Sequence, residues 1–341
     1  MKNVVEKYLT KLESALDLEH QRHARHQCEQ VFEFAEIESL PFICRDVSGA
    51  ADLDWPQFPY NDTFVDEHKM LLDQLRAPFF HNQLRDYHPL NIRSNYGTPI
   101  LPSVFGLAYQ LTETSLPWVH HLASRQEVEA LIERGVPDVR SSLGGRCFDT
   151  AAFYKETLAA YPALSKAISI YHPDLQGPFD VAHLIWGPDI FYALYDCPDT
   201  VHNLLGLVTE TYRVWMRAWK DFVGEGNDFT THWNFYMRGG IMLRNDTAVT
   251  MSARHYDEFV KPYDQTLLDE FGGCIHFCGR GTAFVRSMCD SKNLYGIHMS
   301  QPDWNDTPSV IALAAERRLV MLGLAREYVP ANARSGFIVM A

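Results

Sequence analysis

The 341-residue sequence predicts a (β/α)8 TIM barrel with an N-terminal helical and irregular elaboration. Two observations support this fold class. Short β-rich runs alternate with helical patterns after residue 90, and one such run ends in side chains that can bind a metal. In barrels of this kind the chemistry lies at the carboxyl ends of the strands. A doubly wound open sheet is the alternative, but no glycine-rich dinucleotide turn follows an early strand.

The amino-terminal part lacks the alternating rhythm. Residues 2–36 are expected to form a long helix or a helix pair, because apolar side chains recur at helical spacing among charges. Residues 42–89 are rich in Pro, Asp, Asn and aromatics with little periodicity, which predicts an irregular segment covering one end of the barrel. We therefore expect one structural domain, with residues 1–89 as an extension packed on a barrel of residues 90–341.

From residue 90 onward, strands and helices are expected to alternate. The predicted strands are 98–105, 167–171, 229–233, 240–244, 274–278, 294–299, 319–322 and 337–340. The predicted helices lie around 125–134, over 198–223 and 252–271, and from 282 and 307 onward. Pro198, with Asp199 and Thr200 after it, marks a helix start, since acidic and hydroxyl side chains satisfy free amides in a first turn.

Composition excludes several classes of protein. A formal charge of −13 argues against nucleic-acid binding, which needs a basic surface. The apolar stretches are too short to span a bilayer, and the first fifteen residues lack the apolar core of a signal peptide. Seven cysteines spread through a large chain fit a reducing compartment. We expect a cytoplasmic enzyme with a small-molecule substrate, no nucleic-acid or membrane partner, and a homodimer as candidate assembly.

A histidine and a cysteine two residues apart form the strongest chemical signal. His276 and Cys278 lie in an apolar run that ends at Gly279. A strand sends residues i and i+2 to one face, about 6.6 Å apart at strand rise, so an imidazole and a thiolate can converge on one ion. Zn²⁺ accepts mixed nitrogen and sulfur ligands. The alternative is a pair of inward polar groups without a metal.

Two neighbouring strands add candidates for catalysis and substrate binding. Asp246 follows an apolar strand, where its carboxylate could accept a proton, orient a metal-bound histidine or hold a cationic substrate; otherwise it caps the next helix. His298 ends the strand after His276 and could face the same mouth together with Gln301. A hydrogen-bonded core histidine is the alternative for His298.

The remaining candidates are weaker. Arg280, beside two glycines, could clamp an anionic group or lie solvated. Asp180 and His183 follow a Gly-Pro turn and could line the mouth, although Asp180 could equally stabilise its own loop. Trp233 and Tyr236 could wall an apolar substrate pocket or pack in the core.

Several motifs resemble the uroporphyrinogen decarboxylase superfamily in order and spacing, from about residue 90 to 325. They are Gly177-Pro178-Phe179-Asp180, Gly187-Pro188, Leu194 to Asp199, Asn245-Asp246-Thr247, Lys261-Pro262-Tyr263, His276 to Gly279, Ser300 to Asp303 and Asn305-Asp306. The resemblance implies a barrel with one of two chemistries. One branch decarboxylates uroporphyrinogen without a cofactor, and the other comprises zinc methyltransferases acting between corrinoid proteins and thiols such as coenzyme M.

The resemblance to the zinc branch is carried by His276 and Cys278, which match its first two metal ligands. It implies methyl transfer to a thiol, with a corrinoid on a partner protein or a methylated small molecule as donor. Two departures matter. No cysteine stands near the end of the last strand, where that branch has its third ligand, and the arginine-rich decarboxylase motif is missing, with only Arg85 and Arg93 nearby. Metal-free tetrapyrrole decarboxylation and a non-catalytic corrinoid- or tetrapyrrole-binding barrel remain alternatives.

Overall fold

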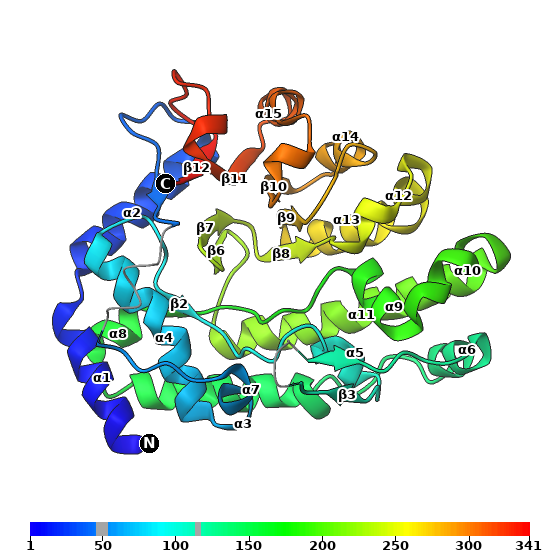
Figure 1. Ribbon diagram of the computed structural model, residues 1–341, viewed down its shortest axis with the longest axis horizontal. Coiled ribbons are helices and arrows are strands. Elements are labelled where there is room, and N and C mark those ends of the chain that lie inside the picture. The colour runs from blue at the N-terminus through cyan, green and yellow to red at the C-terminus, as the bar shows by residue number, and fades with distance from the viewer. Residues whose placement is uncertain (46–53, 113–116) are drawn as a thin grey trace.

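A six-stranded parallel sheet forms the centre of this α/β fold, in the order β1-β12-β11-β10-β9-β8. A computed structural model describes residues 1–45, 54–112 and 117–341 (Figure 1). Its strands are β1 Phe42–Ile43, β2 Asn91–Ile92, β3 Tyr109–Gln110, β4 Trp118–Val119, β5 Ser169–Ile170, β6 Phe229–His232, β7 Phe235–Arg238, β8 Ile241–Arg244, β9 Gly273–Phe277, β10 Leu294–Met299, β11 Val320–Ala325 and β12 Phe337–Met340.

Helices surround this sheet, and α13, α14 and α15 follow β8, β9 and β10 in turn on its outer side (Figure 1). The α-helices are α1 Lys2–Ala15, α2 Leu18–Glu33, α3 Tyr60–Val65, α4 Glu67–Leu84, α5 Ile100–Val104, α6 Arg125–Glu133, α7 Ser142–Leu158, α8 Pro162–Ala167, α9 Pro178–Trp186, α10 Ile190–Asp196, α11 Pro198–Val223, α12 Ala253–Phe259, α13 Lys261–Phe271, α14 Val285–Cys289 and α15 Thr307–Glu316.

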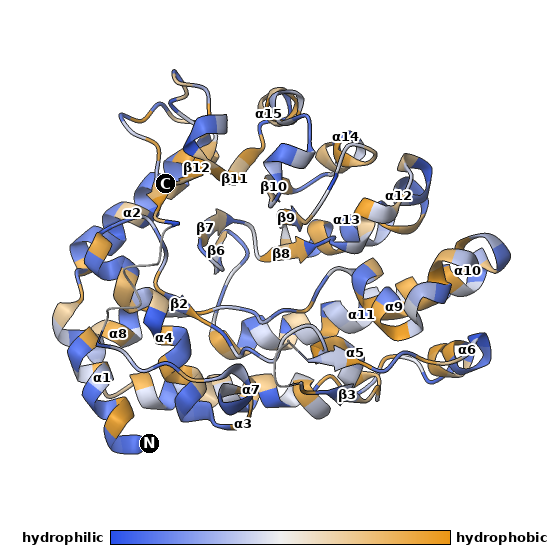
Figure 2. Cartoon of the chain, viewed as in Figure 1, coloured by the Kyte–Doolittle hydropathy of each residue, from blue (hydrophilic) through white to orange (hydrophobic). Residues whose placement is uncertain are grey.

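The central strands are apolar because both faces of the parallel sheet are covered. Every residue of β8 and of β9 is buried, and β8 and β11 carry mostly hydrophobic colour, whereas the outer helices show both colours (Figure 2). Such continuous apolar runs are typical of parallel strands covered on both sides. The predicted strands 240–244, 274–278, 294–299, 319–322 and 337–340 are confirmed.

The described strands do not form one closed sheet, so the predicted closed barrel is not confirmed. A parallel pair, β2 and β5, forms a separate two-stranded sheet without ladder pairing to the six-stranded one. Single backbone hydrogen bonds approach both edges. The Tyr87 amide donates to the carbonyl of Phe42 in β1, and the Gly177 amide donates to the carbonyl of Arg244 at the end of β8.

The β6–β7 hairpin differs most from the prediction. The predicted strand 229–233 exists as β6, but it pairs antiparallel with β7 instead of joining the main sheet. Trp233 sits in the turn with a left-handed φ of 48°. Phe235 and Met237 of this hairpin are buried in a cluster with Met242, Cys274, Val320 and Leu322 of the central strands. The hairpin therefore fills the space on one face of the sheet.

Other parts of the chain depart from the sequence-based expectation. The predicted strand 98–105 is wrong: the helix α5 stands there, and a short buried apolar run does not distinguish strand from helix. The predicted irregular segment 42–89 contains α3 and the 18-residue α4. Helix α4 buries residues around most of its circumference, so no amphipathic stripe announces it. Residues 46–53 of that segment lie outside the described residues.

The helix-pair expectation for residues 2–36 is confirmed by α1 and α2. The expected helix 252–271 is divided into α12 and α13, because Pro262 cannot continue the hydrogen bonding of α12. The division at residue 89 stays a prediction, and β1, which precedes it, pairs with β12. Among the described residues, none of the helices has both the length and the apolar character needed to cross a bilayer.

Candidate metal centre

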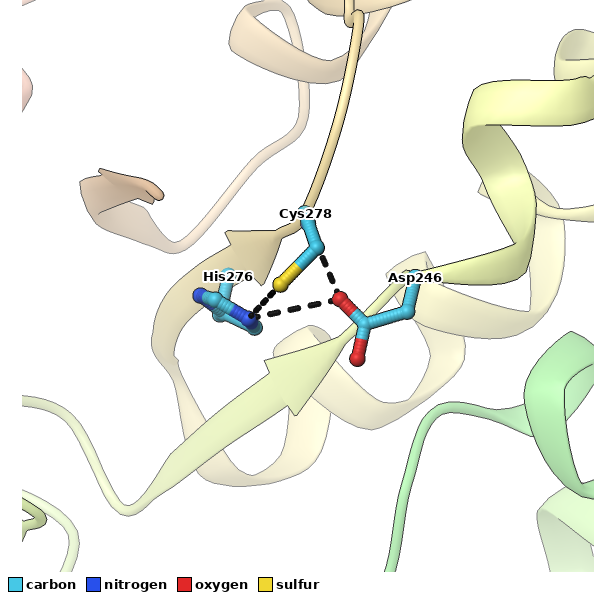
Figure 3. A group of neighbouring side chains, drawn as sticks. All are labelled: Asp246, His276 and Cys278. Carbon is cyan, nitrogen blue, oxygen red and sulfur yellow. Dashed lines mark hydrogen bonds and ion pairs between the residues drawn. The ribbon is translucent and has the colours of Figure 1, made fainter. Parts of the chain in front are cut away.

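Three side chains that can bind a metal converge where β8 and β9 end. His276 is the fourth residue of β9, Cys278 directly follows that strand, and Asp246 lies two residues after β8. Their ligand atoms all lie within 4.8 Å of one another. His276 Nε2 is 3.2 Å from Cys278 Sγ and 3.3 Å from Asp246 Oδ1. Figure 3 shows the three side chains pointing toward one another.

The strand register explains why these side chains meet. Parallel pairing aligns Arg244 of β8 with His276 of β9, and His276 with His298 of β10. Successive side chains of a strand alternate between faces, so Cys278 falls on the face that His276 uses. The chain after β8 then turns toward β9, and Asp246 Oδ1 accepts a hydrogen bond of 2.9 Å from the Cys278 amide.

Asp180 holds the turn that carries Asp246. It lies in the first turn of α9, is 3% exposed, and accepts the backbone amides of Asp246 and Thr247 through its two oxygens, each at 2.8 Å. Burial, with the nearby Asp246 carboxylate, raises the pKa of Asp180 to about 7. On the other side of this turn, the Asn245 side chain donates to the buried Asp264 at 2.6 Å. Two buried carboxyl groups thus fix the backbone on which Asp246 stands.

The electrostatics of the group favour a cation. Burial acts to raise the pKa of Asp246, but interactions with His276 and hydrogen bonding from Cys278 outweigh it, so this pKa lies below its ordinary value. The pKa of the Cys278 thiol is raised by partial burial and by the Asp246 carboxylate. A divalent cation would reverse this second shift, because a coordinating thiol loses its proton.

His298 lies behind His276 instead of beside the converging atoms. The two Nδ1 atoms are 2.9 Å apart, so one imidazole donates to the other. Burial, with the nearby His276, holds the pKa of His298 well below its ordinary value, so it is neutral and can accept this bond. A proton on His276 Nδ1 leaves the lone pair of Nε2 free for a metal, and His298 then orients the ligand, as second partners of metal-binding histidines do.

Trp233 and Arg244 form the wall next to the histidines. The Trp233 ring meets the His276 ring edge to face, with centroids 4.8 Å apart, and the Arg244 guanidinium lies 3.9 Å from the Trp233 centroid. Arg244 is itself paired with Asp174 and donates to His232 Nε2 at 2.9 Å. Trp233 is thus held in place by packing and a cation–π contact.

The structure brings some of the other predicted residues near the group and leaves others away from it. Gln301 accepts the Gly279 amide, and it lines a cavity of about 540 Å³ together with His298. His183, half-buried on α9, approaches Thr247 Oγ1 at 3.4 Å. Arg280 has an exposed side chain. Tyr236 lies elsewhere: its hydroxyl donates to Glu29 at 3.1 Å.

Sequence reasoning left the third ligand unnamed and placed Asp246 among the catalytic residues. The structure brings its carboxylate to the metal-capable pair, since the turn after β8 folds over the end of β9. The available signal was an Asp two residues after an apolar strand. No sequence pattern indicated that Asp180 holds that turn, because this contact depends on how α9 packs.

Comparison with protein-family models gives no match for this sequence. Comparison with curated proteins gives none either. Among solved structures, the fold is similar to that of a "methyltransferase from Methanosarcina mazei", with a TM-score of 0.64 over 89% of this chain and 82% of that chain at 14% sequence identity. The chain therefore has the fold of a known methyltransferase.

Proposed function

We propose that the chain is a zinc-dependent methyltransferase of the zinc branch of the uroporphyrinogen decarboxylase superfamily, acting on a thiol. The observation that carries this proposal is the convergence of Asp246, His276 and Cys278 at the ends of two parallel strands. The likeness in fold to a methyltransferase supports it. We further propose that β2 and β5 complete an eight-stranded barrel, which the backbone contacts at both sheet edges support.

The donor set fits zinc. Imidazole nitrogen, thiolate sulfur and carboxylate oxygen are its ordinary protein ligands, and catalytic zinc sites use three protein ligands and leave a fourth position open. Asp246, His276 and Cys278 would hold the ion. Bound zinc would lower the pKa of a coordinated thiol from about 8.5, which makes that sulfur a nucleophile at neutral pH.

The residues around the ligands have distinct parts in this proposal. His298 orients His276, and Asp180 holds the turn of Asp246. The cavity of about 540 Å³ that His298 and Gln301 line offers room for a substrate next to His298, the partner of His276. In the reaction the thiol loses its proton and its sulfur forms a bond to the methyl carbon. The bond between donor and methyl breaks, and its electron pair stays on the donor, a corrinoid on a partner protein or a methylated small molecule.

Metal analysis of the purified protein tests the site. We expect stoichiometric zinc in the wild type and its loss in the His276→Ala, Cys278→Ala and Asp246→Ala variants. Cys274→Ala is the matched control, because Cys274 lies on the same strand but is buried in the core cluster with Phe235. An anomalous-scattering map at the zinc edge locates the ion. Zinc content that is equal in all of these proteins contradicts the site.

Methyl transfer is tested separately with methylcobalamin and a panel of thiols. We expect the thioether and demethylated cobalamin as products, in equal amounts and only with zinc-loaded protein. Cobalamin binding without transfer would select the non-catalytic alternative. Turnover of uroporphyrinogen by metal-free protein would select the decarboxylase, although of its candidate arginines Arg85 pairs with Asp17 at an exposed site and Arg93 lies 4.0 Å from Asp174.

A further inference from the structure

A second cavity shares Trp233 with the candidate metal centre. Its volume is about 190 Å³, and its walls come from α4, the segments around β2 and β5, and the β6–β7 turn. Trp233 lines this cavity, and its ring also contacts His276. Because one water occupies about 30 Å³ of liquid, the cavity has room for about six waters. That space fits the head group of a small molecule.

Arg93 gives this cavity a cation. It directly follows β2, its side chain is 17% exposed, and among the described residues its Nη1 atom is buried without a hydrogen-bond partner. The Asp174 carboxylate lies 4.0 Å from Nη1, beyond hydrogen-bond distance, and the same carboxylate oxygen pairs with Arg244. One carboxylate oxygen is therefore shared by two guanidinium groups, and a carboxylate bound in the cavity would pair with the remaining positive charge of Arg93.

Asp73 gives the same cavity an acid. It stands on α4, is partly buried, accepts a long hydrogen bond of 3.5 Å from its neighbour Gln74, and has the charge of Arg76 nearby. Burial raises the pKa of Asp73 above its ordinary value, so its charged form gains from a positive partner. A plain anion would satisfy Arg93 but would meet a like charge at Asp73. A ligand with both an ammonium and a carboxylate satisfies both.

We propose that this cavity binds an α-amino-acid head group, with its carboxylate on Arg93 and its ammonium on Asp73. The guanidinium fork matches a carboxylate in two parallel hydrogen bonds, and a carboxylate accepts from an ammonium. The thiol substrate is then an amino-acid thiol whose sulfur reaches past Trp233 to the metal ligands. This second part depends on the proposed function, whereas recognition of the head group does not.

Binding to the metal-free protein tests the head-group site without any thiol. The probes are L-methionine, 4-(methylthio)butyrate, which lacks only the amino group, and 3-(methylthio)propylamine, which lacks only the carboxyl group. Isothermal titration calorimetry should show methionine binding to the wild type about tenfold or more tighter than either analogue, since hydrogen bonds to charged groups contribute on that scale. Equal affinity for all three probes, or no binding of methionine, overturns the proposal.

Two variants assign the two charges. Arg93→Gln should bind methionine and the amine equally, because the methionine carboxylate has lost its partner. Asp73→Asn should bind methionine and the butyrate equally, because the ammonium has lost its partner. Arg85→Gln is the control for loss of an arginine. Arg85 is exposed, lies at the end of α4, the helix that carries Asp73, and pairs with Asp17. The three affinities of this variant should equal those of the wild type. Unchanged selectivity in both cavity variants contradicts the assignment.

A folding defect, or a failure of the methyltransferase proposal, can be distinguished from a failure of the head-group site. If Arg93→Gln does not fold, Arg93→Lys retains the charge without the fork and should lose part of the preference over the amine. Methionine selectivity in a protein that retains no zinc would remove the methyltransferase proposal and keep the head-group site. Zinc retention and methyl transfer to thiols without an amino-acid head group would do the reverse.

Discussion

Replacing Asp180 by Asn tests how the candidate metal centre is held. The two oxygens of Asp180 accept the amides of Asp246 and Thr247, each at 2.8 Å. Asn offers a single oxygen, so its amino group must face one of these N–H groups at close range. A buried donor left unsatisfied costs about 1–3 kcal/mol. We expect the free energy of unfolding of the metal-free protein to fall by roughly that amount, as measured by urea denaturation.

The same substitution should weaken zinc binding. Asp246 reaches the ligand group from the turn that Asp180 holds, and loss of an outer partner of a metal ligand commonly costs about 10–100-fold in affinity. Competition with a chromophoric chelator measures the dissociation constant. Cobalt substitution adds a second measurement, because the visible absorption of bound Co²⁺ reports its coordination geometry and should change in Asp180→Asn.

A double-mutant cycle separates positioning from a general loss of structure. In an Asp246→Asn background, Asp180→Asn should still lower stability but should leave zinc affinity unchanged, because the ligand that it positions is already altered. Asp66→Asn is the matched control: Asp66 also accepts two backbone amides, those of His68 and Lys69, at the start of α4. It should leave zinc affinity unchanged. Equal weakening of zinc binding by Asp180→Asn in both backgrounds would refute the positioning role.

Three further substitutions probe the surrounding structure. His298→Ala removes the partner of His276 Nδ1 and should weaken zinc binding about tenfold in the same competition assay, so an unchanged affinity contradicts its orienting part. Asp264 has a pKa raised by burial to about 8, so between about pH 4 and 8 the folded state holds an extra proton there, and the contribution of Asp264 to stability falls as the pH rises. Asp264→Asn should flatten that slope in urea titrations at several pH values, and an unaltered slope would show that Asp264 is ionised. Gly273→Ala would place a Cβ 2.0 Å from the Ile241 carbonyl oxygen and should destabilise by about 1–3 kcal/mol or more, whereas an unchanged midpoint contradicts this close approach.

The later strands could be predicted from the sequence because the apolar pattern that identifies them lies within each segment. Residues 240–244, 274–278 and 294–299 are mostly apolar, as expected for strands of a parallel sheet buried on both faces. Prediction was poor where packing overrides pattern. Helix α4 is buried around most of its circumference, and the hairpin of β6 and β7 turns back on itself at Trp233 instead of continuing into the sheet.

The sequence by itself determined that His276 and Cys278 share a face, because residues two apart on a strand point the same way. Only the tertiary structure decided what joins them. The register between β8, β9 and β10 sets His298 behind His276, and the turn held by Asp180 carries Asp246 to the thiol. These partners lie 20 to 30 residues or more away along the chain. No local pattern encodes such a contact, because it depends on how strands align and on which helix buries its carboxyl group against a distant turn.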